Sequence, residues 1–109
     1  MVKYQLTIGL NDKNTEKQEI RTNAAKKLIS EILLNRFEIF AYTMLECSGV
    51  YKMQSSGRIV NEKSIRIEIV TNESDFINIP DIVEYLKKEL NQESIMVETF
   101  GLTYDCNFL

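Results

Sequence analysis

Side chains that could bind a small polar molecule gather in four short stretches of the sequence. Asn11 and Asp12 follow an apolar alternating stretch, and Glu62–Ser64 precedes another. Tyr51 ends a stretch rich in aromatic, threonine and methionine residues, and Gln92–Glu93 follows a helical pattern. Amides, carboxylates, hydroxyls and a phenol can fix a ligand's orientation through a few hydrogen bonds. The sequence predicts a ligand-binding site made of Asn11, Asp12, Thr22, Tyr51, Glu62, Ser64, Gln92 and Glu93.

Thr22 enters this set because it lies at the predicted start of a helix over residues 22–36. Unpaired N–H groups and the helix dipole attract negative charge to a helix N-terminus. The predicted ligand is therefore a small anion, such as a nucleotide. An alternative stays open, because Asn, Asp and Ser also cap helices and complete turns without binding anything.

Catalysis is not predicted, and neither catalytic residues, a metal nor a cofactor are assigned. The chain contains no histidine, which is the commonest general base and metal ligand. The favoured function is a non-catalytic sensor or sequestering protein for a small anionic ligand. The alternatives are a protein-interaction module, such as a phage or mobile-element inhibitor of a host enzyme, and an enzyme that uses Glu62, Glu93 and Tyr51.

Alternating and helical patterns predict the elements that must position these residues. Strict alternation from residue 2 to 10 and from 64 to 70 predicts half-buried strands, and apolar spacing of three and four predicts helices. The predicted strands are 2–10, 41–51, 64–70 and 94–100, with a short edge strand at 103–108. The predicted helices are 22–36 and 79–90, and the polar stretch 52–61 predicts a hairpin arm.

This order is β-α-β-β-α-β, which indicates a single α+β domain over residues 1–109. It predicts a ferredoxin-like two-layer sandwich with an antiparallel sheet. In that arrangement both helices cover one sheet face, and the four ligand-binding stretches meet at one edge. The other face would carry polar residues, and it could pack against a second copy, so a homo-oligomer (dimer or trimer) is expected. The polar residues expected there are Lys3, Gln5, Thr7, Arg66 and Glu68.

Three segments of the sequence resemble a small bacterial family of uncharacterised ferredoxin-like proteins. They are TMLECSGVY at 43–51, GRIVNEKS at 57–64 and NQESIMV at 91–97. The resemblance implies the same fold, and it carries no assigned activity. Many members of that family look exported, whereas no export signal is expected here, and the chain has Ala41 where a glycine is usual. The family positions matched here are Gly49, Tyr51, Gly57, Glu62, Ser64, Gln92 and Glu93.

The predicted layout is also similar to PII and CutA-type trimers, in which an arm protrudes between two halves. Their phosphate-binding motifs are not evident, so the similarity is one of architecture.

Charge and hydropathy limit the classes of partner and the cellular location that we expect for this protein. The net charge is −3, and lysines and arginines are scattered, so no nucleic-acid partner is expected. No apolar run reaches the length that a membrane span needs, so no membrane partner is expected. The sequence predicts a cytoplasmic protein with reduced cysteines.

Overall fold

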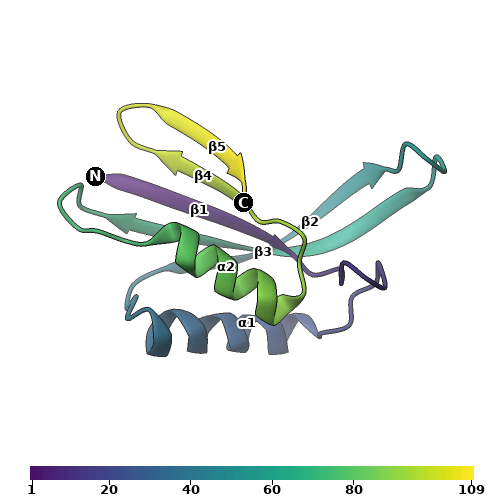
Figure 1. Cartoon of the computed structure of the whole chain (residues 1–109), viewed down its shortest axis with the longest axis horizontal. Coiled ribbons are helices and arrows are strands. Elements are labelled where there is room, and N and C mark those ends of the chain that lie inside the picture. The colour runs from purple at the N-terminus through teal and green to yellow at the C-terminus, as the bar shows by residue number, and fades with distance from the viewer.

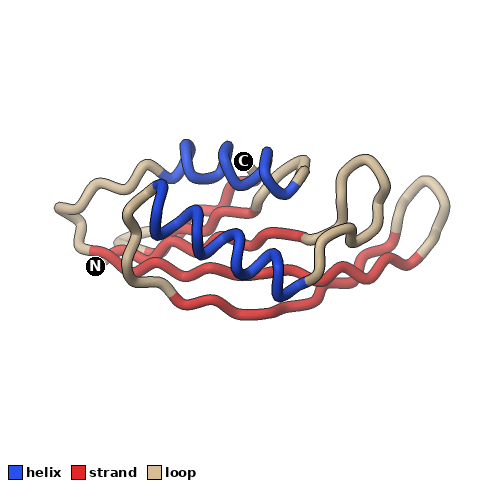
Figure 2. Tube along the Cα trace, turned by 90° about the horizontal axis from the view of Figure 1, so that it is seen from below, coloured by secondary structure: helices blue, strands red, loops and turns tan.

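Two helices pack on one face of a five-stranded antiparallel sheet in the computed structural model, which describes all 109 residues (Figure 1). The view from below separates the two layers, with both helices on the same side of the strands (Figure 2). The prediction of an α+β, ferredoxin-like two-layer sandwich is confirmed. The elements are β1 (Val2–Gly9), α1 (Thr22–Glu31), β2 (Thr43–Lys52), β3 (Ile59–Thr71), α2 (Ile79–Leu90), β4 (Met96–Phe100) and β5 (Tyr104–Phe108).

Strand β1 lies at the centre of the sheet, whose order is β2-β3-β1-β4-β5. Leu6 pairs with Ile67 on β3 and with Val97 on β4. Leu6 and Ile8 are fully buried, because alternate side chains of β1 point towards the helices. The predicted edge strand exists as β5, which pairs with β4.

The helices contribute the other half of the core. Residues at helical spacing on α2 are buried, as its amphipathic pattern predicts, and a five-residue π-helical turn at Ile32–Arg36 extends α1. None of the helices is long and apolar enough to cross a membrane. The buried helical residues are Ala25, Ile29, Ile32, Leu33, Ile79, Ile82, Val83, Leu86 and Leu90.

The two helices begin differently. Neither Thr22 nor Asn23 caps the first helix, because Arg21 occupies the capping position without a side-chain hydrogen bond. The hydroxyl of Thr22 instead accepts a hydrogen bond from Nε2 of Gln18 at 3.1 Å. On α2, by contrast, the backbone N–H of Asp81 donates to the Asn78 side chain.

Replacing Asn78 with alanine is expected to lower the free energy of unfolding by about 1 kcal/mol, because an orphan N–H of α2 loses its acceptor. Urea denaturation followed by circular dichroism measures the change. Asn23→Ala is the matched control, since Asn23 is exposed and does not cap α1. An equal loss in both variants would contradict the assignment.

The predicted arm is an extension of the β2–β3 ladder. Pairing continues to Lys52 opposite Ile59, and the N–H of Met53 donates to the carbonyl of Arg58 at 2.9 Å. Gly57 has a φ of 72°, the left-handed conformation that glycine adopts without a steric penalty. The arm leaves the body of the domain and bends away from the helices (Figure 1).

Candidate functional site

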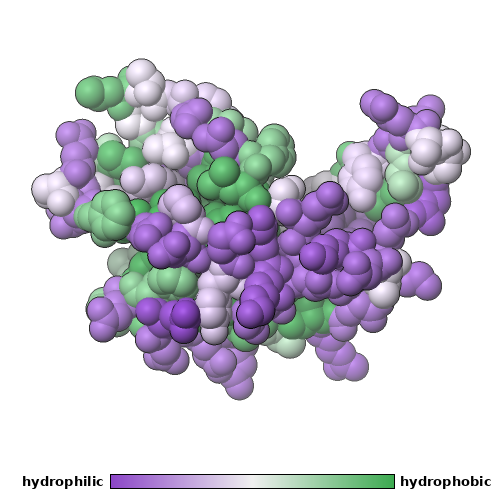
Figure 3. All heavy atoms as spheres, in the orientation of Figure 1, coloured by the Kyte–Doolittle hydropathy of each residue, from purple (hydrophilic) through white to green (hydrophobic).

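A cleft of about 500 Å³ lies on the face of the sheet that the helices leave open. Thr7 and Gly9 line it, because they alternate with the inward-facing Leu6 and Ile8. Tyr51 lines it from the arm, and Phe108 does so from β5. Figure 3 shows a deep notch between the arm and the rest of the domain. We call this feature the sheet cleft.

The sheet cleft collects most of the residues that the sequence analysis proposed for ligand binding. Those that line it are Asn11, Asp12, Tyr51, Glu62, Ser64, Gln92 and Glu93. Their convergence follows from the sheet topology, while their role in binding stays a prediction. Thr22 does not join them, since it lies in a separate hollow with Asn23 and Lys63 at the start of α1. The N-terminus of α1 therefore contributes no donors to the sheet cleft.

Glu62 has a carboxylate that is tied to the loop after β1. Its Oε2 accepts a hydrogen bond from the backbone N–H of Asn11 at 3.0 Å. The side chain is half-buried, and its partner on β2 is Gly49, which leaves the β2 side of Glu62 free of any side chain. A carboxylate held in this way presents a fixed negative charge to a molecule in the cleft.

Gln92 fastens the loop that follows β1, and it is buried. Its Nε2 donates to the carbonyl of Asn11 at 2.8 Å and to that of Leu90 at 3.3 Å. Two carbonyl neighbours fix which end of the amide is nitrogen, because an oxygen there would be repelled. The Gln92 side-chain oxygen therefore faces away from them and is free to accept a hydrogen bond from a ligand.

Asp12 is held against the end of α2. The Asn91 side-chain amide, the largest cause, and the backbone N–H groups of Asn14 and Thr15 keep the pKa of Asp12 below its ordinary value of 3.8. A lowered folded-state pKa means that the stabilisation is present above about pH 4 and is lost as the pH falls through the folded value.

Acidification is therefore expected to weaken the hydrogen bond between Asp12 and the Asn91 side chain, one of the contacts that hold the loop after β1. The amide resonances of Asn14 and Thr15, which donate to Asp12 Oδ1, are the direct probe. They should move together as the pH falls below about 4, and Asp12→Asn should remove most of that movement. Resonances that stay constant down to about pH 2 would contradict the assignment.

Charge in the sheet cleft favours a cation. Asp12, Glu16, Glu62 and Glu93 line it, against Lys13 and Arg58. Arg58 is already paired with Glu16 at 3.4 Å, in a bridge between the arm and the loop after β1. The prediction of an anionic ligand does not fit this balance, because the donors expected from α1 lie elsewhere and the carboxylates remain in excess.

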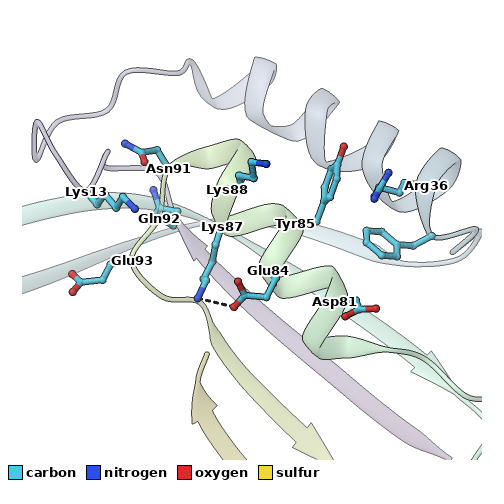
Figure 4. A pocket seen from close by; sticks show the side chains of 11 residues that line it. Lys13, Arg36, Asp81, Glu84, Tyr85, Lys87, Lys88, Asn91, Gln92 and Glu93 are labelled. Atoms are coloured by element: carbon cyan, nitrogen blue, oxygen red, sulfur yellow. Dashed lines mark ion pairs between the residues drawn. The ribbon is translucent and has the colours of Figure 1, made fainter.

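A second and larger hollow, about 740 Å³, lies over the outer surface of α2 (Figure 4). Arg36 stacks 4.1 Å from the ring centroid of Tyr85, and Lys87 pairs with Glu84 at 3.0 Å. Its charges are mixed and partly satisfied by one another. Only its rim, formed by Lys13, Gln92 and Glu93, is shared with the sheet cleft. We therefore place the functional site in the sheet cleft, although it is the smaller of the two.

Several cleft residues had no individual signal in the sequence. Glu16 and Arg58 lie far apart in the chain, and the sequence around each of them indicates only a polar connection. Met96 and Phe108 lie opposite one another on β4 and β5, and they give the cleft an apolar side. Gly9 had a detectable signal, because a glycine inside a strand often marks a close approach of another group.

The chain matches no protein-family model and no curated protein sequence. Its fold is similar to that of a phage SAM lyase solved in complex with S-methyl-5'-thioadenosine, with a TM-score of 0.68 and 20% identity over 99% of this chain and 89% of that one. The phage SAM lyase in the apo state gives a TM-score of 0.66 and 21% identity, over 99% of this chain and 87% of that one. At this identity the likeness establishes a shared fold.

The likeness corrects two predictions. Both structural neighbours are lyases, which overturns the prediction of a non-catalytic binding protein and the prediction that the chain is not an enzyme. The structural neighbours also differ from the PII and CutA-type trimers that the layout suggested. That a small molecule is a partner agrees with the ligand held by one neighbour. The resemblance to the uncharacterised ferredoxin-like family stays a prediction.

Proposed function

We propose that this chain cleaves S-adenosylmethionine in the sheet cleft and releases S-methyl-5'-thioadenosine. The observation that carries the proposal is the fixed Glu62 carboxylate in an acidic cleft, on a fold similar to that of a phage SAM lyase. The proposed setting is that of a phage-encoded enzyme in the cytoplasm, the compartment that holds the proposed substrate.

The charge of the proposed substrate suits the cleft. S-adenosylmethionine carries a sulfonium and an α-ammonium group besides one carboxylate, so it is a net cation, whereas S-methyl-5'-thioadenosine is neutral. A cleft with excess carboxylates raises the local concentration of a cation. The apolar side formed by Met96 and Phe108 offers a surface for the adenine ring.

The proposed reaction breaks the bond between sulfur and the Cγ carbon of the methionine part. The electron pair of that bond stays on sulfur, which becomes the neutral thioether of S-methyl-5'-thioadenosine. The Cγ carbon receives an electron pair from the substrate's own carboxylate oxygen, and a five-membered lactone closes. Atoms and charges balance without water, a proton or a co-reactant.

Glu62 is assigned to pair with the α-ammonium group of the substrate. The sulfonium charge disappears as the bond breaks, so a carboxylate placed there would stabilise the substrate more than the transition state. The ammonium keeps its charge throughout, and pairing it with Glu62 holds the methionine part folded. Folding brings the substrate's carboxylate to Cγ, which is catalysis by orientation. The free side-chain oxygen of Gln92 is a second acceptor for the same ammonium group.

Incubation of the purified protein with S-adenosylmethionine, followed by liquid chromatography and mass spectrometry, tests the proposal. The expected products are S-methyl-5'-thioadenosine and homoserine lactone in equal amounts. Detection of an unsaturated amino acid in place of the lactone would show that the bond breaks by elimination and not by ring closure. No thioadenosine above the protein-free control would contradict the proposed function.

Association with further copies through the helix-free face belongs to the same proposal. Large side chains on that face are exposed in the single chain, including Leu45, Tyr104 and Phe108. A monomer rarely leaves extensive apolar surface uncovered. Native mass spectrometry should give a dimer or trimer, and a monomer at micromolar concentration would contradict this part.

A further inference from the structure

Gly9, the last residue of β1, occupies the point where β1 passes the Glu62 side chain. A Cβ atom placed on Gly9 would lie 2.6 Å from Cδ, Oε1 and Oε2 of Glu62. Attractive contacts between such atoms begin at about 3.5 Å, so a methyl group and the carboxylate cannot share this space. The carboxylate therefore fills the position that a side chain at residue 9 would take.

The backbone of Gly9 does not itself require glycine. It belongs to the extended β1 strand, and Gly57 is the one glycine of the chain with a left-handed φ. The need for glycine at residue 9 arises from the neighbouring carboxylate alone. Gly49 on β2 pairs with Glu62 on β3 and differs from Gly9, because a Cβ atom on Gly49 would have no atom within 4 Å.

The carboxylate is consequently confined on one side and open on the other. The backbone of β1 lies beneath it, the N–H of Asn11 holds Oε2 at 3.0 Å, and the space over Gly49 is free for a ligand. We infer that Gly9 is a positioning residue: its missing side chain lets the Glu62 carboxylate lie against β1, where the cleft opens towards it. Its importance for turnover rests on the proposed function, while the positioning itself does not.

Gly9→Ala is expected to displace the Glu62 carboxylate without unfolding the protein. The end of the flexible Glu62 side chain can rotate away from an added methyl group, and alanine restricts the unfolded chain more than glycine does. The melting temperature should stay level or rise. Gly101→Ala is the matched control, since a Cβ atom there would lie 3.8 Å from Val2, an ordinary contact far from the cleft.

The direct readout is the amide proton of Asn11 in a ¹H–¹⁵N NMR spectrum. Loss of its charged acceptor should shift this resonance in Gly9→Ala and leave it in place in Gly101→Ala. An Asn11 amide that keeps its wild-type shift in Gly9→Ala would overturn the positioning role, whether or not the protein cleaves S-adenosylmethionine.

Turnover gives the second readout. Gly9→Ala should lower kcat/KM for S-adenosylmethionine at least about tenfold, and adding it to Glu62→Gln should cost nothing further, because residues that act as one unit are not additive. A moved Asn11 resonance with unchanged turnover would overturn the claim that this carboxylate position matters for the reaction. A wild-type protein without turnover would refute the proposed function and leave the NMR result to decide on Gly9.

Discussion

Glu62→Gln is expected to lower kcat/KM for S-adenosylmethionine by at least about 30-fold, because truncating one partner of a desolvated charge pair costs roughly 2–5 kcal/mol. The substitution keeps the size of the side chain and removes its negative charge. The amide of Glu62→Gln could still accept from the N–H of Asn11. The expected loss therefore concerns the ligand and not the fold.

The affinity for S-methyl-5'-thioadenosine should change little in the same variant. This product lacks the ammonium group to which Glu62 is assigned, so calorimetry should give a Kd within about threefold of the wild-type value, a difference below 1 kcal/mol. Glu31→Gln on the exposed surface of α1 is the matched control and should retain full turnover. Equal turnover in wild type and Glu62→Gln would contradict the assigned role.

Leu6→Ala is expected to give the largest loss of stability, about 3–4 kcal/mol in the free energy of unfolding. Leu6 is fully buried on the central strand and lies between Ile67 and Val97. The cavity is bounded by rigid strands on both sides, so little relaxation is available to fill it. Such a loss is a large fraction of the roughly 5–15 kcal/mol that holds a domain folded.

Urea denaturation measures this change, and Leu102→Ala provides the control. Leu102 is 99% exposed in the β4–β5 turn, so the same chemical change should alter the free energy of unfolding by less than about 0.5 kcal/mol. Comparable losses in the two variants would show that the core is not centred on β1.

Local patterns in the sequence were sufficient for the elements and their order. Alternation in β1 and helical spacing in α2 each depend on one buried face, which a single chain reveals through period alone. Topology then brought Asn11, Glu62 and Gln92 to one cleft. These inferences need only the pleat of a strand and the connection rule of a β-α-β unit.

The side of the sheet on which the site lies could not be predicted in the same way. Thr22 was included because α1 begins at the same edge as the cleft, but α1 lies behind the sheet and the cleft lies in front of it. Removing the N-terminus of α1 from the site changes the sign of the expected ligand charge. The carboxylates that line the cleft then favour a cation, where the sequence predicted an anion.

The close approach of Gly9 and Glu62 was also out of reach, because it depends on the side-chain conformation of a residue on another strand. The sequence contains a glycine at the end of a strand and a glutamate 53 positions later, with nothing in either pattern to join them. Only the register of β1 against β3, with Gly9 opposite Ser64, brings them together.

Titration of ¹⁵N-labelled protein with S-methyl-5'-thioadenosine tests most directly the central claim that the sheet cleft holds the thioadenosine. Saturable shifts are expected for the amides of Thr7, Ser64, Met96 and Phe108, which line the cleft on the side proposed for the adenine ring. Shifts confined to Asn23 and Ala24 at the start of α1, or to Tyr85 and its neighbours on α2, would contradict the account.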